Sequence, residues 1–422
     1  MREAVRSGLT PEIVITGVGV LSAAGRGLLP LAEALRAGRS CAHPWASALP
    51  VAEVAEVTAP VAPLPDFPDD RKAWLALAAL EDAIADAGGA GPRPFGDQRV
   101  AVYLGTGLSS VTPDELRADL YPHIIDGPDG RIFDRAAMAR DLDPARAAPR
   151  RHLPARVTTA FARRLQATGP VGTSFSACAA AAQAIAEGAL AIRRGLADVA
   201  VVGGHDSMIH PMGLLSFVVL GALSPSRCRP FDQHRDGFLI GEGAAVLVLE
   251  RRDAAVARGA RIYGHLLGAG TSVDAWNVTA PHPEGLGAEL AMRRALADAG
   301  LEPGAVGWVN AHGTGTPVGD VAEASAVGRV FGRVPVSSIK GAVGHTIAAA
   351  GAVEAVATLA AFSADILPGT CGTDTPDPAC PVDVVLAPRA GAPRVVVSNS
   401  FGFGGQNASL VLAHPSWEGR HG

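Results

Sequence analysis

The chemistry that this sequence could perform is centred on Cys178, in the segment Ser-Phe-Ser-Ala-Cys-Ala-Ala-Ala-Ala at 174–182. The alanine-rich run after it ends at Arg193-Arg194-Gly195, as a helix with cations in its last turn and a glycine cap would. Cys178 is therefore expected in the first turn of a buried helix, where unpaired N–H groups and the helix dipole lower the pKa of a thiol. A cysteine that only fills a gap in the core is the alternative, and the residues downstream argue against it.

Two histidines, a lysine and an aromatic residue follow predicted strands in the second half. His312 lies in the loop Ala-His-Gly-Thr-Gly-Thr after a strand at 306–310, and Lys340, one of only two lysines, ends another strand. His345 comes five residues later, and Phe403 lies in a Phe-Gly-Phe-Gly-Gly loop between two further strands. Each group alone could be structural. Because ligands gather at the carboxyl ends of strands in α/β sheets, we expect the four to meet near the cysteine.

The composition limits the class of protein. The 422 residues, 48% of them hydrophobic, are enough for one large domain or two of moderate size. A net charge of −5 leaves no footprint for nucleic acid. Five cysteines at irregular spacing indicate neither a disulfide framework nor a zinc site, and they fit a reducing compartment. Since neither a signal peptide nor a membrane span of ~18 uncharged apolar residues is apparent, a cytoplasmic location is expected.

The elements that must position these groups alternate between strand and helix, which favours an α/β fold with much parallel pairing. Two halves, 1–252 and 253–422, repeat one order of elements from an opening strand to a pair of closing strands. The segment around 113–154 is charged, rich in proline and arginine and only patchily periodic, and we interpret it as a cap over the main sheet. The glycine turn at 17–19 is not a dinucleotide loop, because Ser22 stands where a third glycine is required.

On these motifs the sequence resembles an elongating β-ketoacyl-acyl-carrier-protein synthase, or ketosynthase, of the thiolase superfamily. The matching pieces are the Ser-Ala-Cys segment, Asn-Ala-His-Gly-Thr-Gly-Thr from Asn310, the run from Lys340 through His345 to Glu354, and Ser-Asn-Ser-Phe-Gly-Phe-Gly-Gly-Gln-Asn from Ser398. The resemblance implies a five-layered thiolase fold made of two pseudo-symmetric α/β halves. It also implies a dimer.

The reaction that the resemblance implies is a decarboxylative Claisen condensation in fatty acid or type II polyketide biosynthesis. An acyl group would move from acyl carrier protein to Cys178. A malonyl thioester would then lose carboxylate and attack the acyl-enzyme. The backbone N–H groups of Cys178 and Phe403 would stabilise the oxyanion, and the flanking Gly402 and Gly404 would let the Phe403 loop act as a gate.

Further residues receive roles by the same resemblance. His312 and His345 would donate hydrogen bonds to the extender carbonyl, His345 as a neutral imidazole at a helix start. Lys340 would orient His345, and Thr314 and Thr316 would bind the phosphopantetheine arm. A supporting group around water or a monovalent cation would comprise Glu354, Asn310, Ser398 and Asn399.

No resident cofactor and no catalytic metal are expected, because the substrates arrive on acyl carrier protein. Carrier proteins of this system are acidic, so a basic entrance is expected in spite of the negative net charge. The candidate docking residues are Arg71, Lys72, Arg150, Arg151, Arg227 and Arg229. Solvated surface arginines are the alternative for any one of them.

Three alternatives remain open at this stage. A thiolase would share the fold but would carry a second cysteine where this chain has His345. A chain-length partner subunit of a ketosynthase heterodimer would lack the nucleophile, and an acyltransferase that passes the acyl group to oxygen or nitrogen would not need both histidines. Alanines at 179–181 replace hydroxyl residues found in many relatives, which leaves the acyl chain open and slightly favours a polyketide pathway. Homodimer and heterodimer are both compatible with the sequence.

Overall fold

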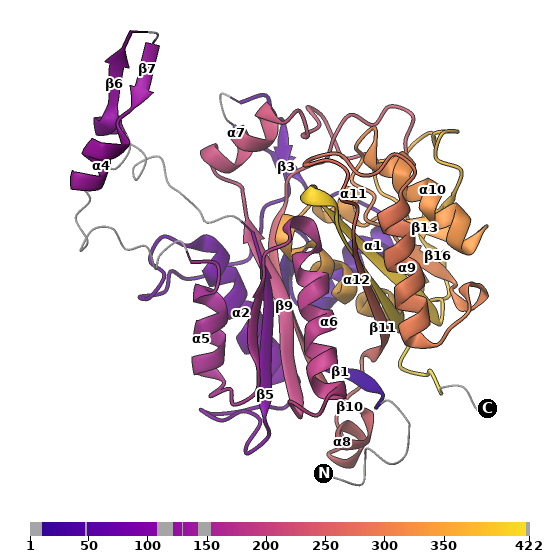
Figure 1. The fold of residues 1–422 in the computed structure, drawn as a ribbon. Coiled ribbons are helices and arrows are strands. Elements are labelled where there is room, and N and C mark those ends of the chain that lie inside the picture. The colour runs from indigo at the N-terminus through magenta and orange to yellow at the C-terminus, as the bar shows by residue number, and fades with distance from the viewer. Residues whose placement is uncertain (1–10, 47–48, 108–120, 129, 142–152, 419–422) are drawn as a thin grey trace.

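The computed structural model describes residues 11–46, 49–107, 121–128, 130–141 and 153–418. Within them the chain forms one long mixed sheet with helices on its faces (Figure 1). The expected α/β class with parallel and antiparallel pairing is confirmed.

The strands of the two halves follow the same spatial order, third, second, fourth, fifth and first, from each outer edge to the centre. The central neighbours β1 and β11 pair antiparallel over three residues. Because order and pairing sense repeat, a pseudo-twofold axis relates the halves. The strands are β1 (Ile13–Ser22), β5 (Val100–Thr106), β8 (Val171–Ser174), β9 (Val199–Ser207) and β10 (Glu242–Arg251), then β11 (Gly264–Val273), β12 (Trp308–Asn310), β13 (Pro335–Ser337), β17 (Val395–Gly402) and β18 (Gln406–Ala413).

The strands of the two halves form two layers, and helices form the other three. The central pair is α6 (Ala180–Arg193) and α12 (Ala350–Ala364), whose alanines share one apolar core with the inward faces of β9, β10 and β18. A second core lies under α2 (Arg71–Asp86) and α5 (Arg156–Arg164), and a third under α9 (Leu286–Ala299) and α10 (Gly319–Phe331). Figure 1 shows this sequence of layers from α5 across to α10. It is the five-layered arrangement that the sequence predicted.

Paired glycines bring the outer helices close to the sheet. A side chain at Gly19 would lie 1.9 Å from the carbonyl oxygen of Ala79 on α2, and one at Gly270 would lie 2.2 Å from that of Ala291 on α9. Only glycine allows a backbone to approach this closely. The turn predicted at 17–19 was wrong, because Gly17 and Gly19 lie inside β1, where they are a packing device that recurs in β11 at Gly268 and Gly270.

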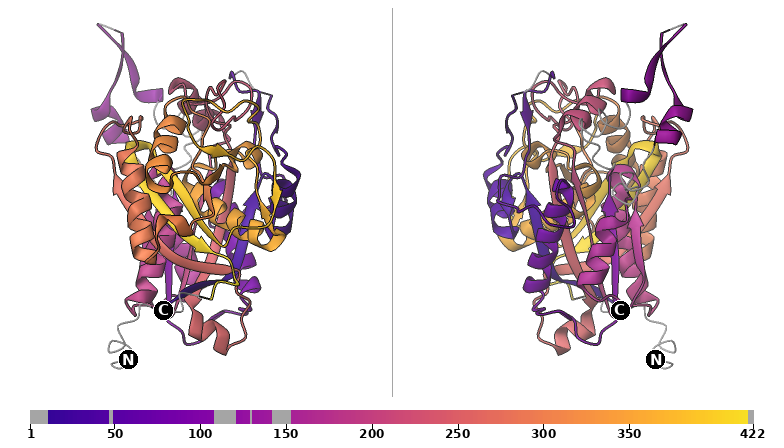
Figure 2. Two further views of the ribbon diagram at one scale, coloured as in Figure 1. Left: turned by 90° about the vertical axis from the view of Figure 1, so that its right-hand side faces the viewer. Right: turned by 90° about the vertical axis from the view of Figure 1, so that its left-hand side faces the viewer.

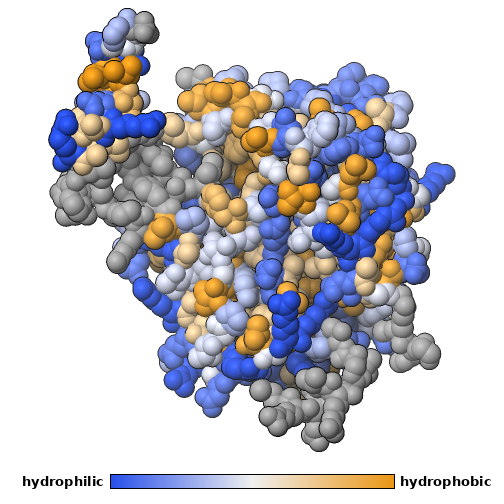
Figure 3. All heavy atoms as spheres, in the orientation of Figure 1, coloured by the Kyte–Doolittle hydropathy of each residue, from blue (hydrophilic) through white to orange (hydrophobic). Residues whose placement is uncertain are grey.

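The segment predicted as a cap is different in the structure. Its described part is a short helix η3 (Tyr121–His123), a hairpin of β6 (Ile124–Gly127) and β7 (Gly130–Phe133), and α4 (Arg135–Asp141). These elements bond to one another, and in Figures 1 and 2 they project from the body instead of covering the sheet. Apolar side chains of the hairpin are exposed (Figure 3). The rest of the predicted cap, 113–120, 129 and 142–152, lies outside the described residues.

One stretch, Ile347–Ala364, is long and apolar enough to cross a membrane by composition. It contains α12 and is 89% buried inside the protein. It is therefore the central core helix.

The remaining elements are short. They are β2 (Gly25–Arg26), α1 (Leu28–Ala37), β3 (His43–Pro44), β4 (Glu53–Val54), η5 (Ala177–Ala179), α7 (Pro211–Val219), α8 (Arg252–Ala257), η6 (Pro303–Ala305), α11 (Lys340–Val343), η7 (Ile347–Ala349), β14 (Ile366–Leu367), β15 (Asp383–Val384), β16 (Arg389–Ala390) and η8 (Phe403–Gly405). Lys340 begins α11, where the sequence predicted that it would end a strand.

Candidate active site

Cys178 lies in a sharp turn between β8 and α6. The preceding Ala177 has φ +48°, a left-handed conformation that a residue with a Cβ rarely adopts. The turn continues as η5 and then as α6, so the thiol lies at the start of the central helix, as predicted. Only 6% of Cys178 is exposed. A strained turn of this kind fixes where the sulfur points.

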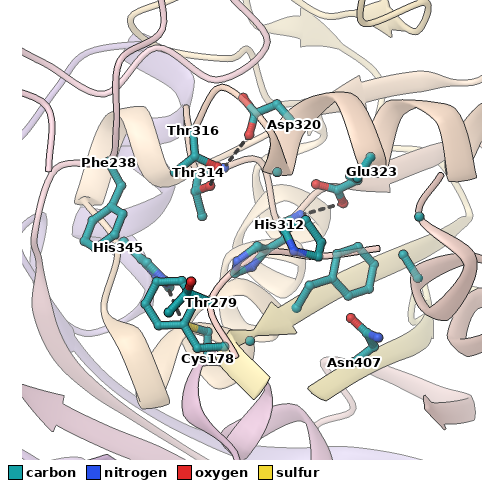
Figure 4. A pocket seen from close by; sticks show the side chains of 18 of the residues that line it. Cys178, Phe238, Thr279, His312, Thr314, Thr316, Asp320, Glu323, His345 and Asn407 are labelled. Atoms are coloured by element: carbon teal, nitrogen blue, oxygen red, sulfur yellow. Dashed lines mark hydrogen bonds between the residues drawn. The ribbon is translucent and has the colours of Figure 1, made fainter. Parts of the chain in front are cut away.

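Both predicted histidines meet the sulfur. His345 Nε2 lies 3.0 Å from Cys178 Sγ, and the rings of His312 and His345 contact edge to face with centroids 5.3 Å apart. One ligating atom from each of the three residues lies within 4.8 Å of the other two. Figure 4 shows them converging on one pocket from different elements. The chain positions His345 through its backbone, which exchanges hydrogen bonds with Leu239 and Gly241.

The ionisation of the cysteine differs from the prediction. Burial raises the pKa of Cys178 to about 12, and the nearby Lys340 only partly opposes this. Burial also holds the pKa of His345 well below its usual value, with Lys340 acting in the same direction. The predicted lowering of the Cys178 pKa was wrong, because desolvation in a pocket walled by Phe217, Phe238 and Ile347 outweighs the helix dipole. The resting pair is a neutral thiol beside a neutral imidazole.

Lys340 contacts the other histidine. Its Nζ lies 3.3 Å from His312 Nδ1, donates to the His312 carbonyl oxygen at 2.6 Å and pairs with Glu354. The prediction that Lys340 orients His345 was therefore wrong. An ammonium facing Nδ1 makes that nitrogen the acceptor, so the ring proton of His312 is on Nε2. The same charge and, more strongly, burial lower the pKa of His312.

The predicted supporting residues divide between the two faces of β17. Ser400 Oγ donates to Glu354, and Asn310 donates from Nδ2 to the Glu354 carbonyl oxygen. Asn310 Oδ1 and Ser398 Oγ, on residues that are register partners in β12 and β17, are buried without a partner among the described residues. Asn399 does not join this group, because alternate residues of a strand point to opposite faces. It donates to Glu323 and accepts from Ser409.

Two buried carboxylates hold the His312 loop. Glu323 accepts hydrogen bonds from the N–H groups of His312 and Gly313, and Asp320 accepts from those of Thr314 and Gly315. Burial raises the pKa of Asp320 to about 6 and that of Glu323 to about 7. Neither residue was among the site residues predicted from the sequence. The structure assigns them to the site, and their signal was the loop of glycines and threonines just before them.

The pocket beside the sulfur contains the other predicted groups. Thr314 and Thr316, 3.0 Å apart at their hydroxyls, lie on one wall, and Phe403 and Gly402 lie on another. A side chain at Gly402 would lie 3.0 Å from the Cys178 backbone nitrogen, so this glycine leaves the N–H uncovered. The apolar wall consists of Phe217, Phe238 and Ile347.

The predicted docking residues fare unevenly. Arg71 is held by Glu242 and the Val57 carbonyl oxygen, and Lys72 is buried on α2, so these two predictions were wrong. The backbone of Arg229 packs against Gly315, and Arg227 is exposed beside Asp374. The other two candidates, Arg150 and Arg151, lie outside the described residues.

Comparison with known proteins gives one family. Residues 69–255 match the model of the beta-ketoacyl synthase N-terminal domain, and residues 263–374 match that of the C-terminal domain. The 3-oxoacyl-[acyl-carrier-protein] synthase 2 of Synechocystis sp. is 36% identical over 358 residues, 81% of each chain. The Staphylococcus aureus enzyme of the same name is 36% identical over 356 residues, 81% of this chain and 84% of its own.

Solved structures agree. The ishigamide ketosynthase/chain length factor superposes with TM-score 0.82 at 33% identity, and a beta-ketoacyl synthase from Burkholderia phymatum with TM-score 0.84 at 32%. Both cover 96% of this chain and 99% of their own. A type II PKS ketosynthase in complex with its acyl-carrier protein (AntDE:AntF) superposes with TM-score 0.80 at 25% identity, over 96% of this chain and 100% of its own.

Proposed function

We propose that this chain, which belongs to the beta-ketoacyl synthase family, performs the decarboxylative Claisen condensation through Cys178, His345 and His312. It is a β-ketoacyl-acyl-carrier-protein synthase of fatty acid or polyketide biosynthesis. The observation that carries the assignment of residues is the approach of one thiol and two imidazoles at the buried end of a single pocket. The protonation of these three groups determines which of them donates and which accepts a proton in each step.

The acyl group is transferred first. Because the resting thiol is neutral, Cys178 attacks the carrier thioester as its proton passes to His345 Nε2, 3.0 Å away. The sulfur–carbonyl bond forms, the bond to the phosphopantetheine sulfur breaks, and His345 returns the proton to the departing thiolate. The acyl-enzyme is then left beside a neutral imidazole, and His345 has the same protonation as before the transfer.

Condensation needs hydrogen-bond donors and no base. Malonyl carrier protein loses its carboxylate as CO₂, and the electron pair of that bond becomes an enolate. The proton on His312 Nε2, held there by the Lys340 ammonium on the opposite nitrogen, stabilises the enolate oxygen. The carbanion attacks the acyl carbonyl, a carbon–carbon bond forms, and Cys178 leaves as a thiolate that takes up one proton from water.

The backbone N–H groups of Cys178 and Phe403 stabilise the oxyanion of both tetrahedral intermediates. The support is geometric: Gly402 has no side chain, so nothing at that position covers the Cys178 N–H. Thr314 and Thr316 line the route to the sulfur and bind the phosphopantetheine arm. The backbone of Arg229 packs behind that wall against Gly315, and Arg229 and the exposed Arg227 receive the acidic carrier protein in the cytoplasm.

A monovalent cation or a water molecule with a structural role fits one position beside the active site, between β12 and β17. The orphaned oxygens Asn310 Oδ1 and Ser398 Oγ belong to register partners beside the Glu354 carbonyl oxygen, which accepts from Asn310 Nδ2, and they are suited to ligate a monovalent cation or to hold one water molecule. All are hard oxygen ligands of the kind that such ions prefer. The group would hold β12 and β17 together and take no part in the bond changes.

Intact-mass analysis tests the function. The protein is offered a panel of acyl carrier proteins and then malonyl carrier protein, with Cys178→Ala as the control. We expect one acyl adduct on the wild type, none on the variant, and loss of the adduct together with CO₂ release when malonyl carrier protein is added. Absence of any adduct would favour a chain-length partner subunit, and an adduct that never decarboxylates malonyl carrier protein would favour an acyltransferase.

A further inference from the structure

The internal twofold matches the two halves residue by residue. The bulge of β1 between Ile15 and Gly17 recurs in β11 between Leu266 and Gly268. Gly19 and Gly270, which approach α2 and α9, follow at the same spacing. These landmarks fix β1 against β11 with no choice of register.

The turns before the central helices match as well. Ala177 and Ile347 both have φ +48°, each begins a 3-10 turn, and each turn continues into its central helix. Ala348 is therefore the counterpart of Cys178. It has the same backbone conformation and position, without the sulfur.

The strand that faces each turn can be matched through the ladder. From the aligned β1 and β11, Leu21 pairs with Ala244 of β10, and Ser272 pairs with Asn407 of β18. One residue before these partners come Gly243 in β10 and Gln406 in β18. Gly243 pairs with Asp206 of β9, and Gln406 pairs with Gly402 of β17. Asp206 thus corresponds to Gly402, and the next residue, Ser207, corresponds to Phe403.

The two equivalent places are occupied differently. Asp206 Oδ2 accepts the Ala348 N–H at 3.1 Å, and its Oδ1 accepts the Ser207 N–H at 2.9 Å. The counterparts of these donors are the N–H groups of Cys178 and Phe403. Neither of those donates to a protein oxygen within the described part of the chain, because Gly402 has no side chain to accept them.

We propose that Asp206 is the resident anion of a second oxyanion-hole nest, related by the internal twofold to the one at Cys178, and that it positions His345. The ligand class of this nest is a small carboxylate, supplied here by the chain itself. The comparison also explains the open hole at Cys178, which is the same pair of N–H groups with the carboxylate left out. The link to catalysis depends on the proposed function, whereas anion binding by the nest does not.

The positioning role follows from where the nest lies. Asp206 is 1% exposed, on the inner face of β9 against Gly107, and it fixes the first turn of η7 through Ala348. His345 is only three residues before Ala348. Without the carboxylate, two buried N–H groups lose their acceptor and the turn that follows His345 is free to relax. Asp206 touches no reacting atom in this arrangement.

The test is rescue by an added anion. Asp206→Gly gives the first half the same open turn that Gly402 gives the second. Thermal unfolding and the rate of condensation are measured in sodium formate and in sodium chloride at equal ionic strength. We expect the variant to lose about tenfold or more in kcat in chloride, with a smaller change in KM, and a lower midpoint of unfolding. Formate should raise the midpoint of the variant and restore part of kcat, with no such effect on the wild type.

Two outcomes would overturn the proposal: equal midpoints of Asp206→Gly in formate and chloride, or an equal response of the wild type. Asp206→Asn is the matched variant. Its amide has the size of the carboxylate and fills the nest, but its NH₂ group faces one of the two backbone N–H donors and cannot accept a hydrogen bond from it. It should fold, show reduced kcat and ignore formate, and wild-type kcat in this variant would refute the need for an anion. Rescue of the midpoint without rescue of kcat would leave the nest established and remove its link to His345.

Discussion

Cys178 and His345 form a neutral pair whose charge separates only while an acyl group is being transferred. A buried thiolate and imidazolium would be poorly solvated in the resting enzyme, and the apolar side chains of Phe217, Phe238 and Ile347 around the sulfur offer no compensating hydrogen bond. The bound thioester supplies the electrophile next to which the proton moves.

Lys340 divides the two half-reactions. In Lys340→Met the 3.0 Å contact between Cys178 and His345 is retained and only the longer-range effect of the charge on their pKa values is lost, so acyl loading should largely persist. The Nε2 tautomer of His312 is no longer enforced, and condensation should fall by about tenfold or more. Intact mass and CO₂ release measure the two steps separately. Equal losses in both steps would place Lys340 with His345 instead.

The same change leaves Glu354 buried without its cation. We expect Lys340→Met to lose about 3–5 kcal/mol of stability for this reason. The double variant Lys340→Met, Glu354→Gln should regain most of that stability in denaturant unfolding and none of the condensation rate. A double variant as unstable as the single one would show that the charge of Glu354 is not the cause.

His205 should make the protein acid-sensitive. Both ring nitrogens are buried without a partner among the described residues, and burial lowers the pKa to about 3 from 6.5. The folded state therefore binds fewer protons than the unfolded state between these values, and stability falls as pH drops below 6.5. His205→Phe, which copies the symmetry-related Phe401, should gain about 2 kcal/mol relative to the wild type at pH 5. At pH 8 the titration contributes nothing, so unfolding curves whose difference does not change with pH would exclude this cause.

The sequence identified most reactive residues but not their contacts. Cys178, His312, Lys340 and His345 follow strands or begin helices in a pattern that is visible without coordinates. Which histidine Lys340 contacts depends on the side of α11 from which its long side chain leaves, and no spacing rule fixes that. The raised pKa of Cys178 was missed because desolvation depends on the whole pocket.

At the scale of elements, close packing of α2 and α9 on paired glycines sets the distance between layers. Gly19→Ala would force a methyl group into the Ala79 backbone and should cost about 3 kcal/mol, since a backbone cannot yield as a side chain can. Gly328→Ala on α10 is the control, because nothing lies within 4 Å of the added methyl group. It should be neutral or stabilising by up to about 1 kcal/mol through helix propensity. Urea unfolding measures both, and a neutral Gly19→Ala would contradict the packing argument.

Elements with a strong period were predictable, and those without one were not. The alanine helix α6 appears close to its predicted place. The described part of the predicted cap projects from the body, because its charged, irregular sequence has no face that selects a surface to cover. Strand ends also moved, as at Lys340, where Ile339 with helical φ and ψ already caps α11.

In the whole molecule, the pseudo-twofold axis brings the start of one helix from each half to the centre. Only one of these two helix starts, at Cys178, carries a nucleophile. The sheet edges are unequal in a similar way. At one end β15 has only two residues, a length that discourages pairing with another chain. At the other end β8 has four residues, with Val171 48% exposed and Phe175 just beyond it 52% exposed.

An uncharged edge strand with an exposed valine beside the active-site cysteine is expected to pair with a second subunit, because exposed edges are otherwise blunted by charge or proline. Val171→Lys would place a charge in that interface, and we expect light scattering after size exclusion to show a monomer where the wild type is a dimer. Val256→Lys on α8, a position of similar exposure far along the chain, should remain dimeric. Since β8 leads within four residues to Cys178, the monomer should also load acyl groups more slowly, and a fully active monomer would show that the edge and the site are independent.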